Sequence, residues 1–116
     1  MDNPRDFIGR WRIIETEMWD RDALDLVAPA SLTFQKNRTG TMKFIAVSVW
    51  IDYRIGQRDG KPAVEFSFQG QDEGDPICGR AWAVLEGSQL RGRLYFHMGD
   101  DSSFVAERFP ERESKK

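Results

Sequence analysis

The chain contains one histidine and one cysteine, and these two side chains are the first candidates for chemistry. His97 could serve as a general base or as a haem ligand. Its neighbours Leu94, Phe96 and Met98 alternate as the inner face of a strand, so His97 is expected to point outward. Cys78 has no histidine near it in the sequence, and no nucleophile motif surrounds it. These residues favour a binding or interaction protein over an enzyme.

Charge and composition narrow the remaining function classes. The acidic stretch 72–75 lacks the ligand spacing of a calcium loop, so we expect no metal and no cofactor. A net charge of −2 does not indicate the positively charged surface with which proteins bind nucleic acid. No apolar run is long enough to span a membrane, and the N-terminal residues contain no apolar signal segment. With a single cysteine, these features predict a cytoplasmic protein that acts on neither nucleic acid nor membrane.

Several polar and aromatic side chains are predicted to face the interior of the protein. Glu15 and Glu17 alternate with Trp11 and Ile13, and Arg80 alternates with Trp82 and Val84. A buried charge costs several kcal/mol unless a partner or ligand compensates it. The predicted ligand-binding set is therefore Glu15, Glu17, Trp19, Tyr53, Phe68, Arg80 and Trp82.

Two explanations of this inward set remain open. Glu17 and Arg80 could line the polar mouth of a small cavity, where Arg80 would bind the head group of an anionic amphiphile. Alternatively, they could pair with each other inside a filled core.

Apolar side chains on otherwise polar faces suggest a different function. Trp50 alternates with polar residues, and Ile14 and Met18 share the outer face of the first strand. Such residues predict an interface, for example in a homodimer. The alternative is a β-bulge within residues 41–55 that would turn Trp50 inward.

Strands separated by turns account for almost the whole chain. We expect strands over residues 11–19, 31–36, 41–55, 63–69, 77–86, 89–98 and 103–109, and one short helix near residues 20–28. These elements predict an all-β fold, an antiparallel up-and-down meander closed into a small barrel. It has eight strands if 41–55 splits and seven if that stretch stays whole. Residues 1–110 form the single domain, followed by a charged, disordered tail at 111–116.

The segment Phe7-Ile8-Gly9-Arg10-Trp11 resembles the Gly-X-Trp opening of the calycin superfamily, which includes lipocalins and fatty-acid-binding proteins. In these families the tryptophan plugs the closed end of the barrel, and an arginine of the last strand packs across it. The resemblance therefore implies closure by Gly9, Trp11 and Arg108. The stretches Gly79-Arg80-Ala81-Trp82 and Phe96-His97-Met98-Gly99-Asp100 also resemble small bacterial lipocalin-like proteins.

For a lipocalin-like barrel with this inward set, the leading expectation is binding of a small, partly apolar or amphiphilic ligand without catalysis. The alternative function is a protein-interaction or homodimer module with a filled barrel and no ligand. An empty interior of several hundred Å3 would favour the first, and a filled interior would favour the second.

Overall fold

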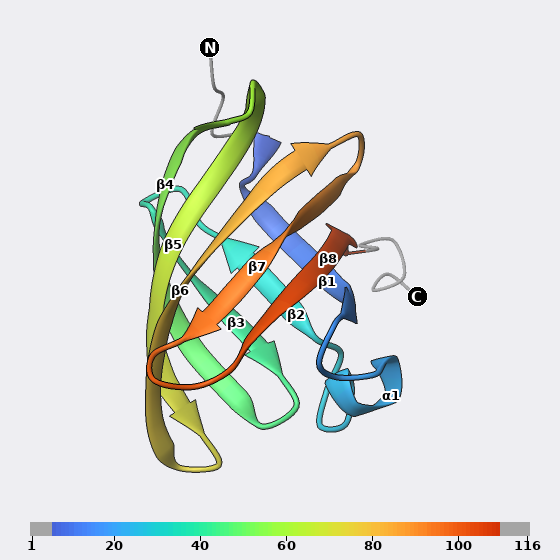
Figure 1. The fold of residues 1–116 in the computed structure, drawn as a ribbon, viewed down its shortest axis with the longest axis vertical. Helices are drawn as coiled ribbons and strands as arrows, with labels where there is room; N and C mark the ends of the chain where they lie inside the picture. Colours follow the sequence, from blue (N-terminus) through green and yellow to red (C-terminus); the bar gives the residue numbers. More distant parts are fainter. Residues whose placement is uncertain (1–5, 110–116) are drawn as a thin grey trace.

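A computed structural model describes residues 6–109, in which eight antiparallel strands follow chain order and close into a barrel (Figure 1). The strands are β1 (Gly9–Thr16), β2 (Ser31–Phe34), β3 (Thr39–Phe44), β4 (Val47–Arg58), β5 (Lys61–Asp72), β6 (Asp75–Glu86), β7 (Gln89–Phe96) and β8 (Asp101–Arg108), and α1 (Arg21–Leu24) lies between β1 and β2. The predicted all-β meander with one short helix is confirmed. The expected tail at 111–116 lies outside the described residues.

The stretch 41–55 is split by a two-residue turn, which makes the strand count eight. Phe44 pairs with Val47 across this turn. Ile45 occupies it with a φ of +54°, a left-handed conformation in which a β-branched residue is strained. The turn Asp59-Gly60, where both φ angles are also positive, carries the usual hairpin residues. Residues 45–46 include none of these hairpin residues, so the number of strands was left open by the sequence.

The helix α1 is shorter than the expected 20–28. Asp20 caps it by accepting a hydrogen bond from the Ala23 amide at 2.9 Å, as its position before the helix predicts. The helix ends at Leu24, which is fully buried. Among residues 6–109, no helix is long and apolar enough to cross a membrane.

Side chains fill the interior of the barrel. Phe34 packs edge-on against Tyr53 and Phe66, with ring centroids 4.8 and 5.7 Å apart. Other inward-facing side chains, each at most 4% exposed, are Leu32, Met42, Ile51, Val64, Leu90, Leu94 and Phe104. A void that held water would leave accessible surface on the side chains around it. The middle of the barrel is therefore packed as a protein core.

An arginine and a tryptophan close one end of the barrel. Arg108 Cζ lies 4.2 Å from the ring centroid of the buried Trp11, and the two residues are paired across β1 and β8. The Arg108 guanidinium also donates to the carbonyls of Asp6 and Ile8, at 2.9 and 2.8 Å. Gly9 has a φ of +123°, and a Cβ there would lie 2.7 Å from Arg108 Nη1. The predicted contact between Trp11 and Arg108 is confirmed.

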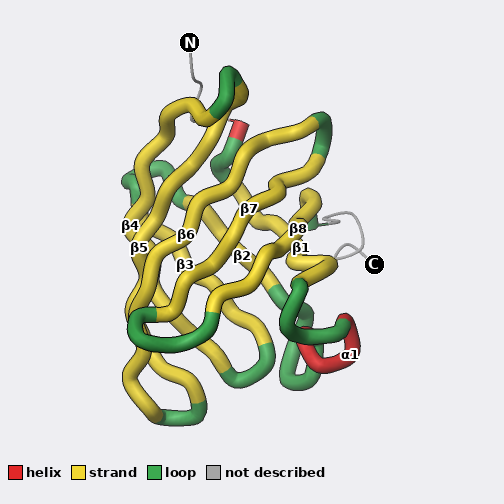
Figure 2. Tube along the Cα trace, viewed as in Figure 1, coloured by secondary structure: helices red, strands yellow, loops and turns green. Residues whose placement is uncertain are grey.

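The opposite end of the barrel, at the bottom of Figure 1, carries α1 and three hairpin turns. These turns join β3 to β4, β5 to β6 and β7 to β8. In Figure 2, α1 and its connecting loops lie along one side of this end. We call it the open end, because no arginine–tryptophan plug covers it in the described part of the chain.

Replacing Arg108 with alanine should lower the free energy of unfolding by about 1–2 kcal/mol, because both the stack on Trp11 and two charge-assisted hydrogen bonds are lost. The near-UV circular dichroism of tryptophan should change with it. Urea unfolding provides the measurement. Arg91→Ala is the control, since its contact with Glu86 at 3.6 Å is solvent-exposed and should contribute less than about 0.5 kcal/mol. Equal losses in both variants would contradict the proposed role of Arg108.

Candidate functional site

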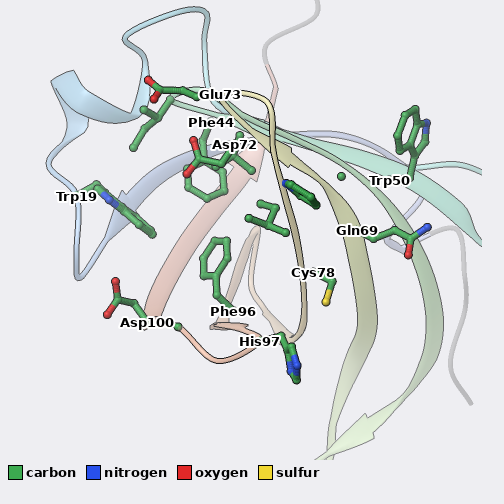
Figure 3. A pocket seen from close by; sticks show the side chains of 16 residues that line it. Trp19, Phe44, Trp50, Gln69, Asp72, Glu73, Cys78, Phe96, His97 and Asp100 are labelled. Atoms are coloured by element: carbon green, nitrogen blue, oxygen red, sulfur yellow. The ribbon is translucent and has the colours of Figure 1, made fainter.

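The open end contains a recess of about 890 Å3 (Figure 3). Its lining residues come from both sides of the hairpin formed by β5 and β6. Phe44 and Phe96 lie on the inner side, whereas Trp50 and Gln69 lie on the outer side. Only part of the recess is therefore inside the barrel mouth, and we call that inner part the mouth.

Aromatic rings form the floor of the mouth. The Trp19 ring centroid lies 5.2 Å from that of Phe44 and 6.3 Å from that of Phe96. Phe96 also contacts Phe68, which is buried one layer deeper, at 5.4 Å. Trp19 and Phe96 are only half-buried, unlike the rings in the middle of the barrel. The floor thus presents aromatic surface to solvent at the one end that lacks the plug.

Local hydrogen bonds place Trp19 over the mouth. The Thr16 hydroxyl donates to the Trp19 carbonyl at 2.6 Å and accepts from the Trp19 amide at 3.0 Å. The buried Ser102 hydroxyl accepts from the amides of Glu17 and Met18, at 3.1 and 3.2 Å. These bonds turn the chain sharply after β1, so that the indole packs on Phe44.

The short helix is attached to the same rim. The Ile45 amide donates to the Leu24 carbonyl at 3.0 Å, which joins the turn between β3 and β4 to α1. Asp25, at the end of α1, forms an ion pair with Arg12 and accepts from the Ala30 amide at 2.9 Å. The helix therefore braces one side of the mouth.

Three carboxylates are among the polar groups around the recess. Asp72, Glu73 and Asp100 line it, together with Gln69 and His97, and among residues 6–109 no lysine or arginine does. Asp72 pairs with the inward-facing Val47 across β5 and β4, so its side chain lies on the mouth side. None of the three carboxylates forms an ion pair within residues 6–109. The mouth thus combines an aromatic floor with an acidic rim.

The structure brings Cys78 and His97 together on the outer edge of the recess. The His97 amide donates to the Cys78 carbonyl at 2.8 Å, and both side chains are exposed. Sequence reasoning missed this proximity because it compared positions along the chain. The hairpin centred on Gly87-Ser88 pairs Gly79 with Phe96. Cys78 and His97, the next residue on each strand, therefore lie opposite each other. The expected outward position of His97 is confirmed.

The inward placement of Glu15 and Glu17 is wrong. A β-bulge between Ile13 and Glu15 adds one residue to β1, which turns the following side chains to the other face. Both glutamates are exposed. Glu17 contacts Arg93 at 3.2 Å, and Arg93 also binds Asp101 at 2.9 Å. Hydrogen bonding to Asp101 raises the pKa of Arg93 above its ordinary value.

The inward placement of Arg80 and Trp82 is also wrong. Arg80 is exposed on the outer face, and Trp82 lies there with the Arg58 guanidinium 3.8 Å from its ring centroid. The inner face of β6 carries Gly79, Ala81 and Ala83 instead, because the large rings of β5 need the space. A Cβ on Gly79 would lie 2.6 Å from Phe68 Cζ. The predicted contact between Glu17 and Arg80 is therefore absent.

The other predicted residues lie as follows. Tyr53 and Phe68 face inward as predicted and are 1% and 3% exposed, and Trp19 lies at the mouth. Trp50 projects from the outer face of β4 and is 70% exposed, so no bulge turns it inward. Met18 is exposed and Ile14 is half-buried.

Comparisons of the chain with protein-family models, with curated proteins and with solved structures give no match.

The phenol of Tyr53 is a structural group rather than part of the mouth. It donates a hydrogen bond to the Gln35 carbonyl, and burial raises the pKa of Tyr53 above its ordinary value. Because the folded state holds the proton more tightly than the unfolded state, the resulting stability is present at neutral pH. It is lost as the pH rises past about 10, where the unfolded phenol ionises.

Tyr53→Phe should cost about 1 kcal/mol at neutral pH, through the lost hydrogen bond. The free energy of unfolding of the variant should also decline less steeply than that of the wild type between about pH 9 and 11. Urea unfolding across this range provides the measurement. Tyr95→Phe is the control, because it removes a phenol that is 40% exposed. If Tyr53→Phe declined as steeply as the wild type, the phenol would not be the group responsible.

Proposed function

We propose that this protein is a lipocalin-like binding barrel that holds a small, partly apolar ligand at its open end without transforming it. The observation that carries the proposal is the half-exposed aromatic floor of Trp19 and Phe96 over a filled interior. Exposed aromatic surface in a concave site is typical of ligand binding. By the cavity criterion, the packed middle of the barrel favours the module without a ligand, so binding requires the ligand to lie in the mouth and not deep inside.

Calycin membership is part of this proposal. It is supported by the all-β meander and by the stack of Arg108 on Trp11. Together with the resemblance to small bacterial lipocalin-like proteins, these features favour a binding role. We also propose a cytoplasmic, reducing location, since Cys78 is an exposed free thiol.

An uncharged probe, 1-octanol, should bind in the mouth and shift the backbone NMR signals of residues around Trp19, Phe44 and Phe96. Phe96→Ala removes part of the floor, and Ile77→Trp fills the space above it. Each should weaken binding by about ten-fold, equivalent to ~1.4 kcal/mol.

Trp82→Ala is the matched control, because this aromatic lies on the outer face against Arg58 and should not affect binding. Urea unfolding of each variant shows whether it is folded. Absence of binding to the wild type, or shifts spread evenly over the surface, would contradict the proposed mouth site.

A second function is supported by Trp50. This indole is 70% exposed and lies between Thr41 and Gln69 in the register of the sheet. A large apolar side chain that is exposed on a polar face is typical of the centre of an interface. We propose homodimer formation through the outer face of β4 as the alternative to ligand binding.

If β4 forms the interface, sedimentation velocity should show concentration-dependent self-association, and Trp50→Lys should shift the protein towards monomer without unfolding it. Ser88→Lys, in the distant turn between β6 and β7, adds the same charge and should leave association unchanged. A wild-type monomer at high concentration would exclude the homodimer.

A further inference from the structure

We infer that the ligand of the mouth carries a positive charge, as an amine or ammonium group attached to an apolar body. This inference rests on the proposed function, since it names the ligand class of the same site. It reverses the expectation of an anionic amphiphile, which depended on Arg80. Arg80 is on the outer face of β6, so it cannot serve the mouth.

The charges around the recess favour a cation. Within residues 6–109, its lining includes three exposed carboxylates and one histidine, His97, but neither lysine nor arginine. Asp72 and Glu73 lie at the tip of the hairpin formed by β5 and β6, and Asp100 lies in the turn before β8. In Figure 3, Asp72 and Glu73 lie on one side of the Trp19 ring and Asp100 on the other. A bound ammonium group would therefore have carboxylates on two sides.

Two arginines that contact elements of the open end are bound to other carboxylates. Arg93 is occupied by Glu17 and Asp101, at 3.2 and 2.9 Å, outside the barrel. Arg12 is paired with Asp25 beyond α1. Among residues 6–109, the rim carboxylates thus have no cationic side chain bound to them, and a cationic ligand would supply one.

The aromatic floor adds a second attraction for the same charge. The faces of aromatic rings attract cations within about 6 Å of the ring centroid, and tryptophan is the strongest of them. Trp19 and Phe96 are half-exposed at the mouth, so an ammonium group could approach them while its apolar body covers the floor. An anionic head group would be repelled by both the rim and the rings.

Three eight-carbon probes separate charge from apolar contact: octylammonium, 1-octanol and octanoate. We expect octylammonium to bind about three- to ten-fold more tightly than 1-octanol, and octanoate more weakly than both, as measured by calorimetry and NMR shifts at the mouth. Raising the salt concentration should weaken octylammonium binding and leave 1-octanol binding unchanged.

The double variant Asp72→Asn, Asp100→Asn should bring octylammonium binding to the level of 1-octanol and leave 1-octanol binding unaffected. Asp52→Asn is the control for a charge outside the rim. It removes one negative charge, half the change of the double variant, from the outer face of β4, where Asp52 is paired with Arg54. It should leave the preference for octylammonium intact.

These results show whether the binding function or only the cationic ligand class is wrong. If 1-octanol binds at the mouth but octylammonium binds no more tightly, the cationic ligand class is wrong and the binding function stands. If Asp52→Asn weakens octylammonium binding as much as the double variant, net charge rather than the rim explains the preference, and the inference also fails. If no probe binds at the mouth, the proposed function itself is wrong.

Discussion

The rest of the structure depends on how much side-chain volume an eight-stranded barrel can enclose. A barrel of this size has an interior just wide enough for side chains or for one small ligand. Here phenylalanine and tyrosine rings from β2, β4 and β5 take that space, with Phe34 in contact with Tyr53 and Phe66. Their volume requires small residues opposite them, and β6 supplies Gly79, Ala81 and Ala83. The filled core in turn leaves only the open end for a ligand.

The two ends of the barrel differ in the charged groups that lie beside their aromatic rings. At the closed end, the Arg108 guanidinium covers Trp11 and binds two carbonyls. At the open end, Trp19 and Phe96 also present aromatic faces, but carboxylates surround them instead of a guanidinium. The interaction that the closed end makes within the chain is the one that a cationic ligand would make at the open end. This parallel gives the proposed ligand class a physical basis within the same molecule.

The open end is shaped by local deviations from regular strand geometry. The bulge after Ile13 turns Glu17 outward to Arg93, and the Thr16 hydroxyl then bends the chain so that Trp19 reaches the mouth. Ile45 adopts a strained positive φ, and its amide binds α1. Strain in a β-branched residue persists only where the surroundings enforce it, and such positions are common near functional sites.

The sequence alone determined the fold class and the order of the strands. Period-two alternation and turn residues such as Asp59-Gly60 are encoded locally. The contact between Trp11 and Arg108 was expected from the resemblance to the calycins, and strand counting brings the two residues together only with eight strands, a number that the sequence left open. Alternation also placed Trp50 on the outer face and Phe68 inside. These predictions needed no knowledge of how one strand packs on another.

Tertiary structure decided the content of the site. Nothing local marks the bulge at Ile13, and a single inserted residue reverses the face of every side chain after it. The inner face of β6 could not be read from its own residues, because Trp82 looks more core-like than Ala81. The bulk of Phe66, which is paired with Ala81 on the neighbouring strand, makes that choice. The acidic rim likewise takes residues from separate hairpins, Asp72 and Asp100, which line the same recess because β5 to β8 pair side by side. Which side chains share a cavity depends on packing between strands, and that information is distributed over the whole chain.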